Sequence, residues 1–564
     1  MPDNMDTMFY NQIFPGNRVL IFIPHEDDEL NIAGALISGL RHDNYRVICV
    51  FSTNGDHGYL AETRIKEAMQ SLKILGVPAE DIVFLGYPDG GTDAARCVFM
   101  NGREKALNAG CRTKTYGMAG KPEFCMSRHG FHRPYTWDGF CEDIRDLLLY
   151  YQPDSIVGVD FDSHPDHRMC SIALEQVVGE LLNRETNDWH PLVLKAFAYN
   201  TGFESVKDFY GENLQSTRFN RERIMDSRLE TDNPVYEWNR RLRLPVPSNC
   251  RTPLLKDNLI FQAARCHLSQ RAMLRADRII NSDEVFWVRR TDNLIFQGNV
   301  TVSSGEGKYL HDFCMICTRD IRPRHNVMME DCLWIPDAGD SLRSCRCTFK
   351  KPQHVEAVSL YGDPGNRGRI LKSRLVFSTG YSCEISSLRP WGQETVVAFP
   401  PQDHVEWVEY QILETEVAQA GISEWEIFAN RKLPCRMLHI LADGHFAYEW
   451  RVPCGEPGPA ITAYTYGINE SVRWSWDGEA CTLGDIQKKC ACITEAHMIR
   501  AEAEGLCNEI SLIPVSFWQR KKRTMRIMMD RLYLWLEKQR IKPAHHKLRM
   551  LKKKQKMTEN QKDT

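Results

Sequence analysis

Residues 18–29 read RVLIFIPHEDDE, and this stretch decides how the N-terminal part of the chain folds. Its first half is a short apolar run, which suits a strand buried on both faces of a parallel sheet. Its second half places one histidine and several carboxylates directly after that strand. Because open parallel sheets bind ligands at the carboxyl ends of their strands, we interpret PHEDDE as part of a functional site.

The rest of the first 200 residues alternates between strand-like and helix-like segments. Further strands are predicted at RVICVFSTNG, DIVFLGYPDGG and SIVGVDFDSHPDH, and helices at 61–76, 138–151 and 169–183. This alternation predicts a doubly wound, Rossmann-like α/β domain. The second polar motif, SHPDH at 163–167, would then lie at the same edge of the sheet as PHEDDE.

The residue types in the two motifs suit a metal centre. Imidazole and carboxylate groups together bind Zn²⁺ and related divalent ions. His25, Asp28 and His167 would supply three ligands and leave the open position that is typical of a catalytic site. Asp27 and His164 would remain beside the metal as the base and acid that metal-assisted hydrolysis needs. The alternative is polar capping of strand ends, but two separate motifs would then have to imitate a metal site.

At these motifs the chain resembles the PIG-L/LmbE-like zinc-dependent de-N-acetylases, whose motifs are written (P/A)HPDDE and HPDH. Here the first reads PHEDDE and the second is complete. Further matches follow the family order: ETRIKEA at 62–68, LGYPDGG at 85–91 and TYG at 115–117. The resemblance covers about residues 17–200. It implies removal of acetyl from an N-acetylated amino sugar, such as an N-acetylglucosamine unit of a glycan, glycolipid or glycan precursor.

The resemblance also implies which residues bind the metal and activate water. His25 and Asp28 from the first motif and His167 from the second would bind Zn²⁺, with Fe²⁺ as the alternative ion. Asp27 would be the general base that activates the metal-bound water. The products would be acetate and a free amine.

Four more residues receive roles from the resemblance. His164 would polarise the amide oxygen or protonate the leaving amine, and Asp166 would orient a neighbouring imidazole. Arg64 and Asp89 would contact sugar hydroxyls. For these last two, the alternatives are an exposed helix arginine and a turn aspartate that bonds its own backbone.

One residue departs from the family pattern. Glu26 stands where the family has proline, between His25 and Asp27. We expect its side chain to point away from the metal and the loop to be slightly less stiff. A third carboxylate beside Asp27 would otherwise repel its charge or alter the choice of metal.

Length and composition predict several domains. A chain of 564 residues exceeds what one core usually holds, and its 43% hydrophobic and 26% charged residues are typical of globular proteins. We divide it into a catalytic domain at 1–215, a helical and mixed extension at 216–328, a β-sandwich at 329–430, a small β-rich module at 431–510 and a helical tail at 511–564. The sandwich is similar to galactose-binding-like (discoidin-type) domains, which implies glycan binding. A sandwich with a purely structural role is the alternative.

The tail differs from the rest in charge. Residues 520–556 contain 15 Lys and Arg against 2 Asp and Glu, although the whole chain has a net charge of −3. Apolar residues recur there at helical spacing, which predicts a basic amphipathic helix. Residues 515–556 would lie on an anionic membrane surface, or dock on the acidic body of the protein. Because that body would repel nucleic acid, no nucleic-acid partner is expected.

The N-terminus has no basic segment followed by an apolar one, and no apolar run approaches the ~18 residues of a membrane span. The 20 cysteines are scattered along the chain. We therefore expect a cytoplasmic protein with reduced thiols, peripheral on the cytoplasmic membrane face if the tail binds lipid. Two functional alternatives remain: a non-catalytic glycan-binding protein with an inactive deacetylase-like domain, or a hydrolase of another amide or thiol conjugate.

Overall fold

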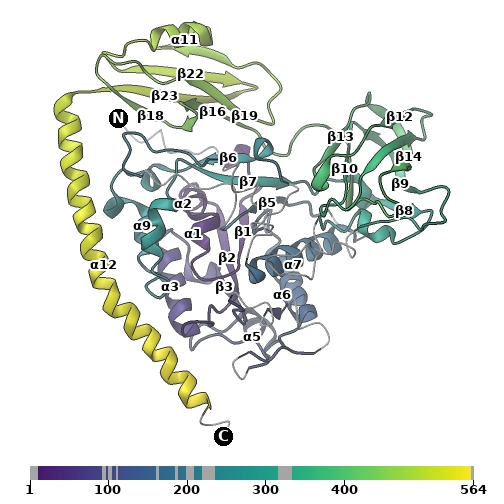
Figure 1. Cartoon of the computed structure of the whole chain (residues 1–564), viewed down its shortest axis with the longest axis horizontal. Coiled ribbons are helices and arrows are strands. Elements are labelled where there is room, and N and C mark those ends of the chain that lie inside the picture. Colours follow the sequence, from purple (N-terminus) through teal and green to yellow (C-terminus); the bar gives the residue numbers. More distant parts are fainter. Residues whose placement is uncertain are drawn as a thin grey trace.

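The computed structural model describes residues 10–91, 97–98, 105–109, 112–160, 164–184, 188–198, 209–218, 236–315 and 333–560. Within these ranges the chain forms an α/β domain, two β-rich units and a long C-terminal helix (Figure 1). The two β-rich units lie on different sides of the α/β domain, and the helix follows a third side.

A seven-stranded sheet with the order β3-β2-β1-β4-β5-β7-β6 forms the centre of the α/β domain. Its parallel strands are β1 (Arg18–Ile23), β2 (Arg46–Thr53), β3 (Ile82–Tyr87), β4 (Ser155–Val159) and β5 (Leu192–Ala196). The intervening helices are α1 (Glu29–Ile32), α2 (Gly34–His42), α3 (Ala61–Ile74), α5 (Phe124–His129), α6 (Trp137–Tyr151) and α7 (Pro165–Leu182). The strand order reverses between β1 and β4. The predicted doubly wound domain is therefore confirmed. Sheets of this kind bind their ligands beside the point where the strand order reverses.

The predicted extension continues this sheet. Its strands β6 (Leu242–Pro245) and β7 (Asp283–Arg289) are antiparallel, and β7 pairs with β5. The short helices α9 (Leu259–Ala264) and α10 (Ala276–Ile279) lie between them in the chain. Glu284 of β7 accepts hydrogen bonds from the backbone N–H groups of Ala35 and Leu36, at 2.9 and 2.8 Å, and so holds the first turn of α2.

The second unit consists of two antiparallel sheets, β12-β11-β14-β9-β8 and β13-β10-β15, which contribute to one hydrophobic core. Its strands are β8 (Gly298–Val302), β9 (Ser344–Val355), β10 (Ala357–Tyr361), β11 (Ile370–Phe377), β12 (Ser382–Ile385), β13 (Thr395–Val397), β14 (Gln402–Thr415) and β15 (Glu424–Phe428). Strand β8 precedes the predicted boundary at 329, yet it pairs with β9. Part of the predicted extension therefore belongs to this unit, because β8 is an edge strand whose partner lies about 50 residues further along the chain.

The third unit has a core of its own. Its two sheets have the orders β17-β16-β19 and β18-β23-β22-β20-β21. The elements are β16 (Met437–Ala442), β17 (His445–Phe446), β18 (Glu449–Pro453), β19 (Ile461–Tyr466), β20 (Arg473–Trp476), β21 (Glu479–Cys481), α11 (Leu483–Lys489), β22 (His497–Ala503) and β23 (Leu506–Val515). Strand β23 thus runs beyond residue 510, the predicted end of this module.

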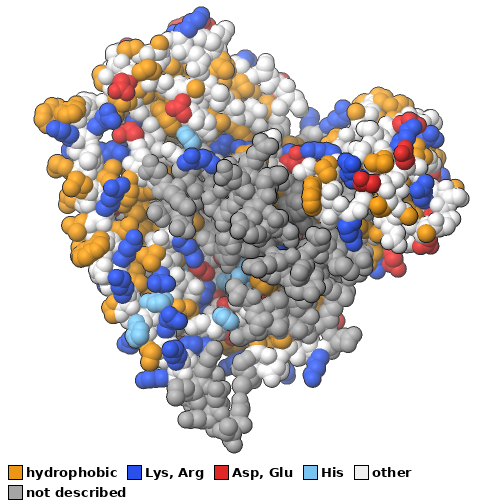
Figure 2. All heavy atoms as spheres, viewed as in Figure 1, with side chains coloured by type: hydrophobic (Ala, Val, Ile, Leu, Met, Phe, Trp, Pro, Cys, Tyr) orange, Lys and Arg blue, Asp and Glu red, His pale blue; other side chains and the backbone are white. Residues whose placement is uncertain are grey.

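Helix α12 (Phe517–Asn560) runs along the α/β domain, past α9 and α3 (Figure 1). On the side that faces the domain, Asp530 is buried and accepts hydrogen bonds from the Tyr210 hydroxyl and the Leu255 backbone N–H, both at 2.8 Å. Apolar side chains on this helix are exposed to solvent. In Figure 2 they appear as orange spheres among the blue spheres of Lys and Arg along the left edge of the molecule. The exposed residues are Met525, Met528, Met529, Leu532, Trp535 and Leu536.

Two further observations, on the helices and on the cysteines, apply to the residues that the structure describes. None of the helices described is both long enough and apolar enough to cross a membrane. The cysteines described all carry free thiols, and most of them are buried.

Candidate metal centre and active site

The first motif forms a tight turn between β1 and α1. The His25 carbonyl accepts the backbone N–H groups of Asp27 and Asp28, at 3.0 and 3.1 Å. Asp27 adopts a φ of +152°, which residues other than glycine rarely adopt. His25, Asp27 and Asp28 are all buried, with at most 7% of their surface exposed. The turn thus holds three polar side chains in place at the end of the strand.

The second motif forms the start of α7. His164 caps this helix, Pro165 occupies its first turn and His167 is completely buried in it. Proline suits this position because its missing N–H would have no partner in the helix. Since β1 and β4 are neighbours in the sheet, the start of α7 faces the turn that follows β1.

The three predicted metal ligands converge. His25 Nδ1 lies 3.0 Å from Asp28 Oδ2 and 3.3 Å from His167 Nε2, and His167 Nε2 lies 3.1 Å from Asp28 Oδ2. Ligand atoms around a tetrahedral zinc ion, with bonds of about 2.1 Å, would lie roughly 3.4 Å apart. The donor set therefore fits a small divalent ion, with little adjustment of the side chains.

The charges of the proposed ligands depend on one another. Burial lowers the pKa of His25, but Asp89, Asp166 and Asp28 outweigh it and hold this pKa well above its usual value. Burial raises the pKa of Asp28, but the neighbouring His167 and His25 outweigh it and hold this pKa well below its usual range. Asp28 is therefore ionised, as a metal ligand has to be. Two groups of three residues, which share His25, each bring their donor atoms within 4.8 Å of one another. One group is His25, His164 and His167, and the other is His25, Asp89 and Asp166.

Asp166 connects the two motifs with the turn after β3. Its Oδ2 lies 3.1 Å from His25 Nε2 and accepts the Gly90 backbone N–H at 2.9 Å. A histidine that binds metal through one ring nitrogen commonly donates its other N–H to a carboxylate, which fixes the ring. Asp166 is placed to do this for His25, so that Nδ1 faces the other two ligands.

His164 stands beside the ligands. Its ring centroid lies 4.6 Å from that of His25 and 4.8 Å from that of His167. Burial, followed by the charges of His25 and His167, lowers the pKa of His164 to about 4, so the ring is neutral at neutral pH. Its Nδ1 accepts the Asp166 backbone N–H at 3.2 Å, and this hydrogen bond assigns the ring proton to Nε2.

Two arginines hold Asp27. Arg64 Nη2 donates to Asp27 Oδ1 at 2.9 Å and to the Glu26 carbonyl at 2.6 Å, and Arg275 forms an ion pair with Asp27 Oδ2. Arg64, for which a sugar contact is predicted, is 4% exposed, and its guanidinium is engaged by Asp27 and the Glu26 carbonyl. Arg275 could not be predicted from the sequence, because it lies 248 positions from Asp27 in a basic stretch without a motif.

Asp89 lies at the edge of the site. Its Oδ1 is 3.6 Å from His25 Nε2 and accepts the Gly91 backbone N–H at 2.7 Å. Its own N–H donates to Asp56 Oδ1 at 3.0 Å. The turn thus holds Asp89 beside the ligand cluster, where the resemblance implies a sugar contact.

Glu26 is completely buried, and its side chain is directed toward Gly55. A Cβ at Gly55, whose φ is +56°, would come within 2.3 Å of Glu26 Oε2, so the loop needs glycine there. Arg64 Nη2 is 3.8 Å from the same oxygen. Burial raises the pKa of Glu26 to about 8, so this carboxyl is largely protonated at neutral pH. It therefore adds no third negative charge next to Asp27 and Asp28.

Two parts of the chain match known families. Residues 20–178 match the PIG-L family, described as GlcNAc-PI de-N-acetylase, and residues 329–428 match a domain of unknown function named DUF7402. No curated protein matches the chain.

Several solved structures are similar to parts of the chain. N,N'-diacetylchitobiose deacetylase from Pyrococcus horikoshii has 16% identity and a TM-score of 0.25, over 51% of this chain and 88% of that one. The A40926 pseudoaglycone deacetylase Dbv21 has 13% identity and a TM-score of 0.26, over 49% of this chain and 98% of that one. The family 32 carbohydrate-binding module of NanJ from C. perfringens, solved with galactose, has 16% identity and a TM-score of 0.18, over 24% of this chain and 94% of that one.

Proposed function

Because residues 20–178 form a PIG-L family domain, we propose that this protein is a metal-dependent amide hydrolase that removes acetyl from an N-acetylated amino sugar. The substrate would be an N-acetylglucosamine-type unit of a glycan, glycolipid or glycan precursor. The convergence of His25, Asp28 and His167 beside Asp27 and His164 carries this proposal. Two nitrogen donors and one oxygen donor favour Zn²⁺, with Fe²⁺ as the alternative.

A divalent ion held by His25, Asp28 and His167 would lower the pKa of a bound water molecule and polarise the amide carbonyl. Asp27 takes the proton of the attacking water. Arg64 and Arg275 each engage one of its oxygens, and a carboxylate has about four acceptor positions, so further positions remain for the water. The two guanidinium groups also fix the direction in which Asp27 faces.

His164 acts on the other side of the amide. Its neutral ring carries the proton on Nε2, so it donates a hydrogen bond to the carbonyl oxygen as negative charge develops there. Two roles are predicted for His164. Because its ring is neutral at working pH, polarisation of the carbonyl is favoured over protonation of the leaving amine. Asp27 then returns the proton that it accepted to the leaving amine. Atoms balance with one water consumed and one acetate released.

Asp89 is the residue that we propose for sugar binding. Its carboxylate lies at the edge of the ligand cluster and accepts the Gly91 backbone N–H, while its own backbone N–H donates to Asp56. Carboxylates in such a position accept hydrogen bonds from sugar hydroxyls. Arg64 would act through Asp27 instead, because its guanidinium is buried and already engaged.

Acetate release from N-acetylglucosamine, its β-linked oligomers and a glycolipid that carries it tests this function. We expect release by the zinc-loaded protein and loss of release in Asp27→Asn. Release of a different acid would favour the alternative amide or thiol-conjugate hydrolase. Sugar binding without any release would favour the non-catalytic glycan-binding alternative.

We also propose a peripheral role for residues 515–556 at an anionic membrane on the cytoplasmic side. The exposed apolar side chains of α12 stand among the 15 basic residues of 520–556, and this combination suits a surface of acidic lipids. The other predicted role, docking on the body, uses Asp530 and its neighbours on the helix. The two roles use different residues and are compatible.

A further inference from the structure

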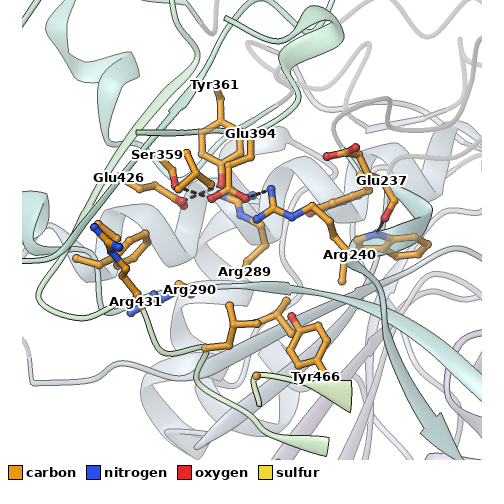
Figure 3. A pocket seen from close by; sticks show the side chains of 18 of the residues that line it. Glu237, Arg240, Arg289, Arg290, Ser359, Tyr361, Glu394, Glu426, Arg431 and Tyr466 are labelled. Carbon is orange, nitrogen blue, oxygen red and sulfur yellow. Dashed lines mark hydrogen bonds and ion pairs between the residues drawn. The ribbon is translucent and has the colours of Figure 1, made fainter. Parts of the chain in front are cut away.

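A cavity of about 390 Å³ lies where the α/β domain and the two β-rich units meet (Figure 3). We call it the junction cavity. The α/β domain contributes β7 and the turn before β6, the second unit contributes β10, β13 and β15, and the third unit contributes the end of β19. Its volume falls in the range of roughly 300–1,000 Å³ that is usual for small-molecule sites. The residues that line it include none of those in the metal centre.

Arginines and carboxyl groups both line the junction cavity. Figure 3 shows Arg240 from the α/β domain and Glu394 from the second unit joined across it as an ion pair. Ser359 also donates to Glu394, at 2.5 Å. Nearby, Glu426 accepts the Tyr361 hydroxyl at 2.8 Å. Donors and acceptors in fixed positions therefore face the same space.

An anionic ligand does not suit this lining. Three of its arginines already have a carboxylate partner, so their charges are balanced locally. The pairs are Arg240 with Glu394, Arg289 with Glu175, and Arg290 with Asp292. The carboxyl groups in the lining would also repel a phosphate or a carboxylate. A cation is disfavoured by the arginines, and a purely apolar ligand would shield these charged groups from water without adding a hydrogen bond.

Aromatic rings supply the apolar part of the lining. Tyr236 and Trp287 stack with their ring centroids 5.6 Å apart at 29°, and both line the cavity. Tyr466 and Tyr361 lie on other sides of it in Figure 3. Rings of this kind offer a flat surface for the C–H face of a sugar.

The side chains of Arg289 and Tyr236 are buried next to each other and interact directly. Both residues line the cavity.

We propose that the junction cavity is a second carbohydrate-binding site, which holds one neutral sugar unit. Sugar hydroxyls both donate and accept, so they can bond with Glu394 and Glu426 and with the arginines beside them. The C–H face of the same ring packs on Trp287 or Tyr466. This site would bind sugars whether or not the α/β domain hydrolyses them, and it would give the enzyme a second hold on a longer glycan.

A bulky substitution that fills the cavity gives the sharpest test. Val396 on β13 lines the cavity and is 57% exposed, so Val396→Trp occupies the space without disturbing a core. Val417 is 41% exposed on the same unit and does not line the cavity, which makes Val417→Trp the matched control. Glu394→Gln is a second variant, which keeps the shape of the lining and removes a charged acceptor.

Isothermal titration calorimetry on the full chain in the Asp27→Asn background would measure binding of galactose, N-acetylglucosamine and chito-oligosaccharides. We expect at least one of these sugars to bind about tenfold more weakly, or more, in Val396→Trp and Glu394→Gln, and with unchanged affinity in Val417→Trp. The proposal is overturned if no sugar binds in a way that Val396→Trp weakens. It is also overturned if inorganic phosphate, titrated in parallel, is the ligand that this variant excludes.

The outcome separates this site from the proposed reaction. Sugar binding that is sensitive to Val396→Trp, in a protein that releases no acetate, would retain the second site and reject the deacetylase. Acetate release by a protein whose sugar binding is insensitive to Val396→Trp would do the reverse.

Discussion

Asp27 is the residue on which the proposed chemistry depends most. It lies next to the metal ligands without being one of the three that converge, and two arginines orient it. We therefore expect Asp27→Asn to lower kcat by about 10²–10⁴-fold, the usual contribution of a general base, while the metal content stays the same. The acetate assay checks the expected loss of activity, and metal analysis of the same purified variant checks that the metal content is unchanged. Loss of the metal together with activity would instead make Asp27 a ligand.

Arg275 provides a second prediction at the scale of a residue. Removal of its charge in Arg275→Gln frees one oxygen of Asp27 and should reduce kcat roughly tenfold or more, as expected for a lost charge-assisted hydrogen bond. Arg271→Gln is the matched control, because this arginine is exposed four positions earlier in the same segment. Equal activity of the two variants would show that Arg64 alone holds Asp27.

The metal ligands could be predicted from the sequence because each motif is short and follows a recognisable strand. His25 and Asp28 are three positions apart, and parallel neighbouring strands bring His167 to the same edge. Arg275 could not be predicted, because its approach to Asp27 depends on how the extension folds back. The neutral state of Glu26 depends on complete burial, which a local pattern does not give.

At the scale of elements, Glu284 joins β7 to the start of α2. Burial raises the pKa of Glu284 from 4.5 to about 7, although two backbone N–H groups oppose this shift. A carboxyl whose pKa is higher in the folded state stabilises the fold below about pH 4.5, and this contribution is lost as the pH rises through 7. We therefore expect the stability of the wild-type protein to fall between pH 5 and 7.5 by more than that of Glu284→Gln.

Thermal unfolding of the full chain at several pH values, with the two proteins side by side, measures this difference. Other groups that titrate contribute equally to both, so the difference between the curves reports Glu284. Parallel curves for the two proteins would mean that the pKa of Glu284 is close to its ordinary value in the folded state.

Helix α12 provides a prediction about docking. Asp530 is 1% exposed and accepts three hydrogen bonds, from the Tyr210 hydroxyl and the backbone N–H groups of Leu255 and Lys256. Asp530→Ala leaves these donors without an acceptor, so we expect faster hydrogen exchange and earlier proteolysis within 517–560. Lys538→Ala, an exposed position on the same helix, is the control. Unchanged protection in Asp530→Ala would mean that apolar contacts alone hold the helix.

Helical spacing of apolar residues predicted this helix but not the way in which it docks. Met525, Met528 and Leu532 define a face that would ordinarily pack on a core, yet they are exposed. The face that docks contains Asp530 and Glu537, which resemble solvent-facing residues until their partners from distant segments are known. The local helical pattern is enough to predict that this segment is a helix, whereas its orientation on the domain depends on long-range hydrogen bonds.

At the scale of the whole molecule, the exposed apolar residues of α12 predict how the protein partitions onto vesicles. The full chain should sediment with phosphatidylserine vesicles at low salt and much less with phosphatidylcholine vesicles, because the basic residues need acidic lipid. Replacement of Met525, Leu532 and Trp535 by Gln should abolish this, whereas Val417→Gln should not. Equal sedimentation of the triple variant and the wild type would reject the membrane proposal.

The arrangement of the units was the part least accessible to prediction. Strands with a period of two indicated β-rich units after residue 330, and these units are present. The junction cavity, by contrast, takes its lining from residues between 236 and 467 that meet only when three units pack together. No local pattern marks such residues. The glycan-binding role suggested by the resemblance of the second unit stays a prediction, which the titrations above address.

Restoration of activity by metal tests the central claim most directly. The full chain is stripped with a chelator and titrated with Zn²⁺, while acetate release from N-acetylglucosamine compounds is followed in the wild type and in Asp27→Asn. We predict that both proteins bind about one ion per chain, and that acetate release returns in the wild type alone. Acetate release that persists without metal, or that is unchanged in Asp27→Asn, would contradict the account.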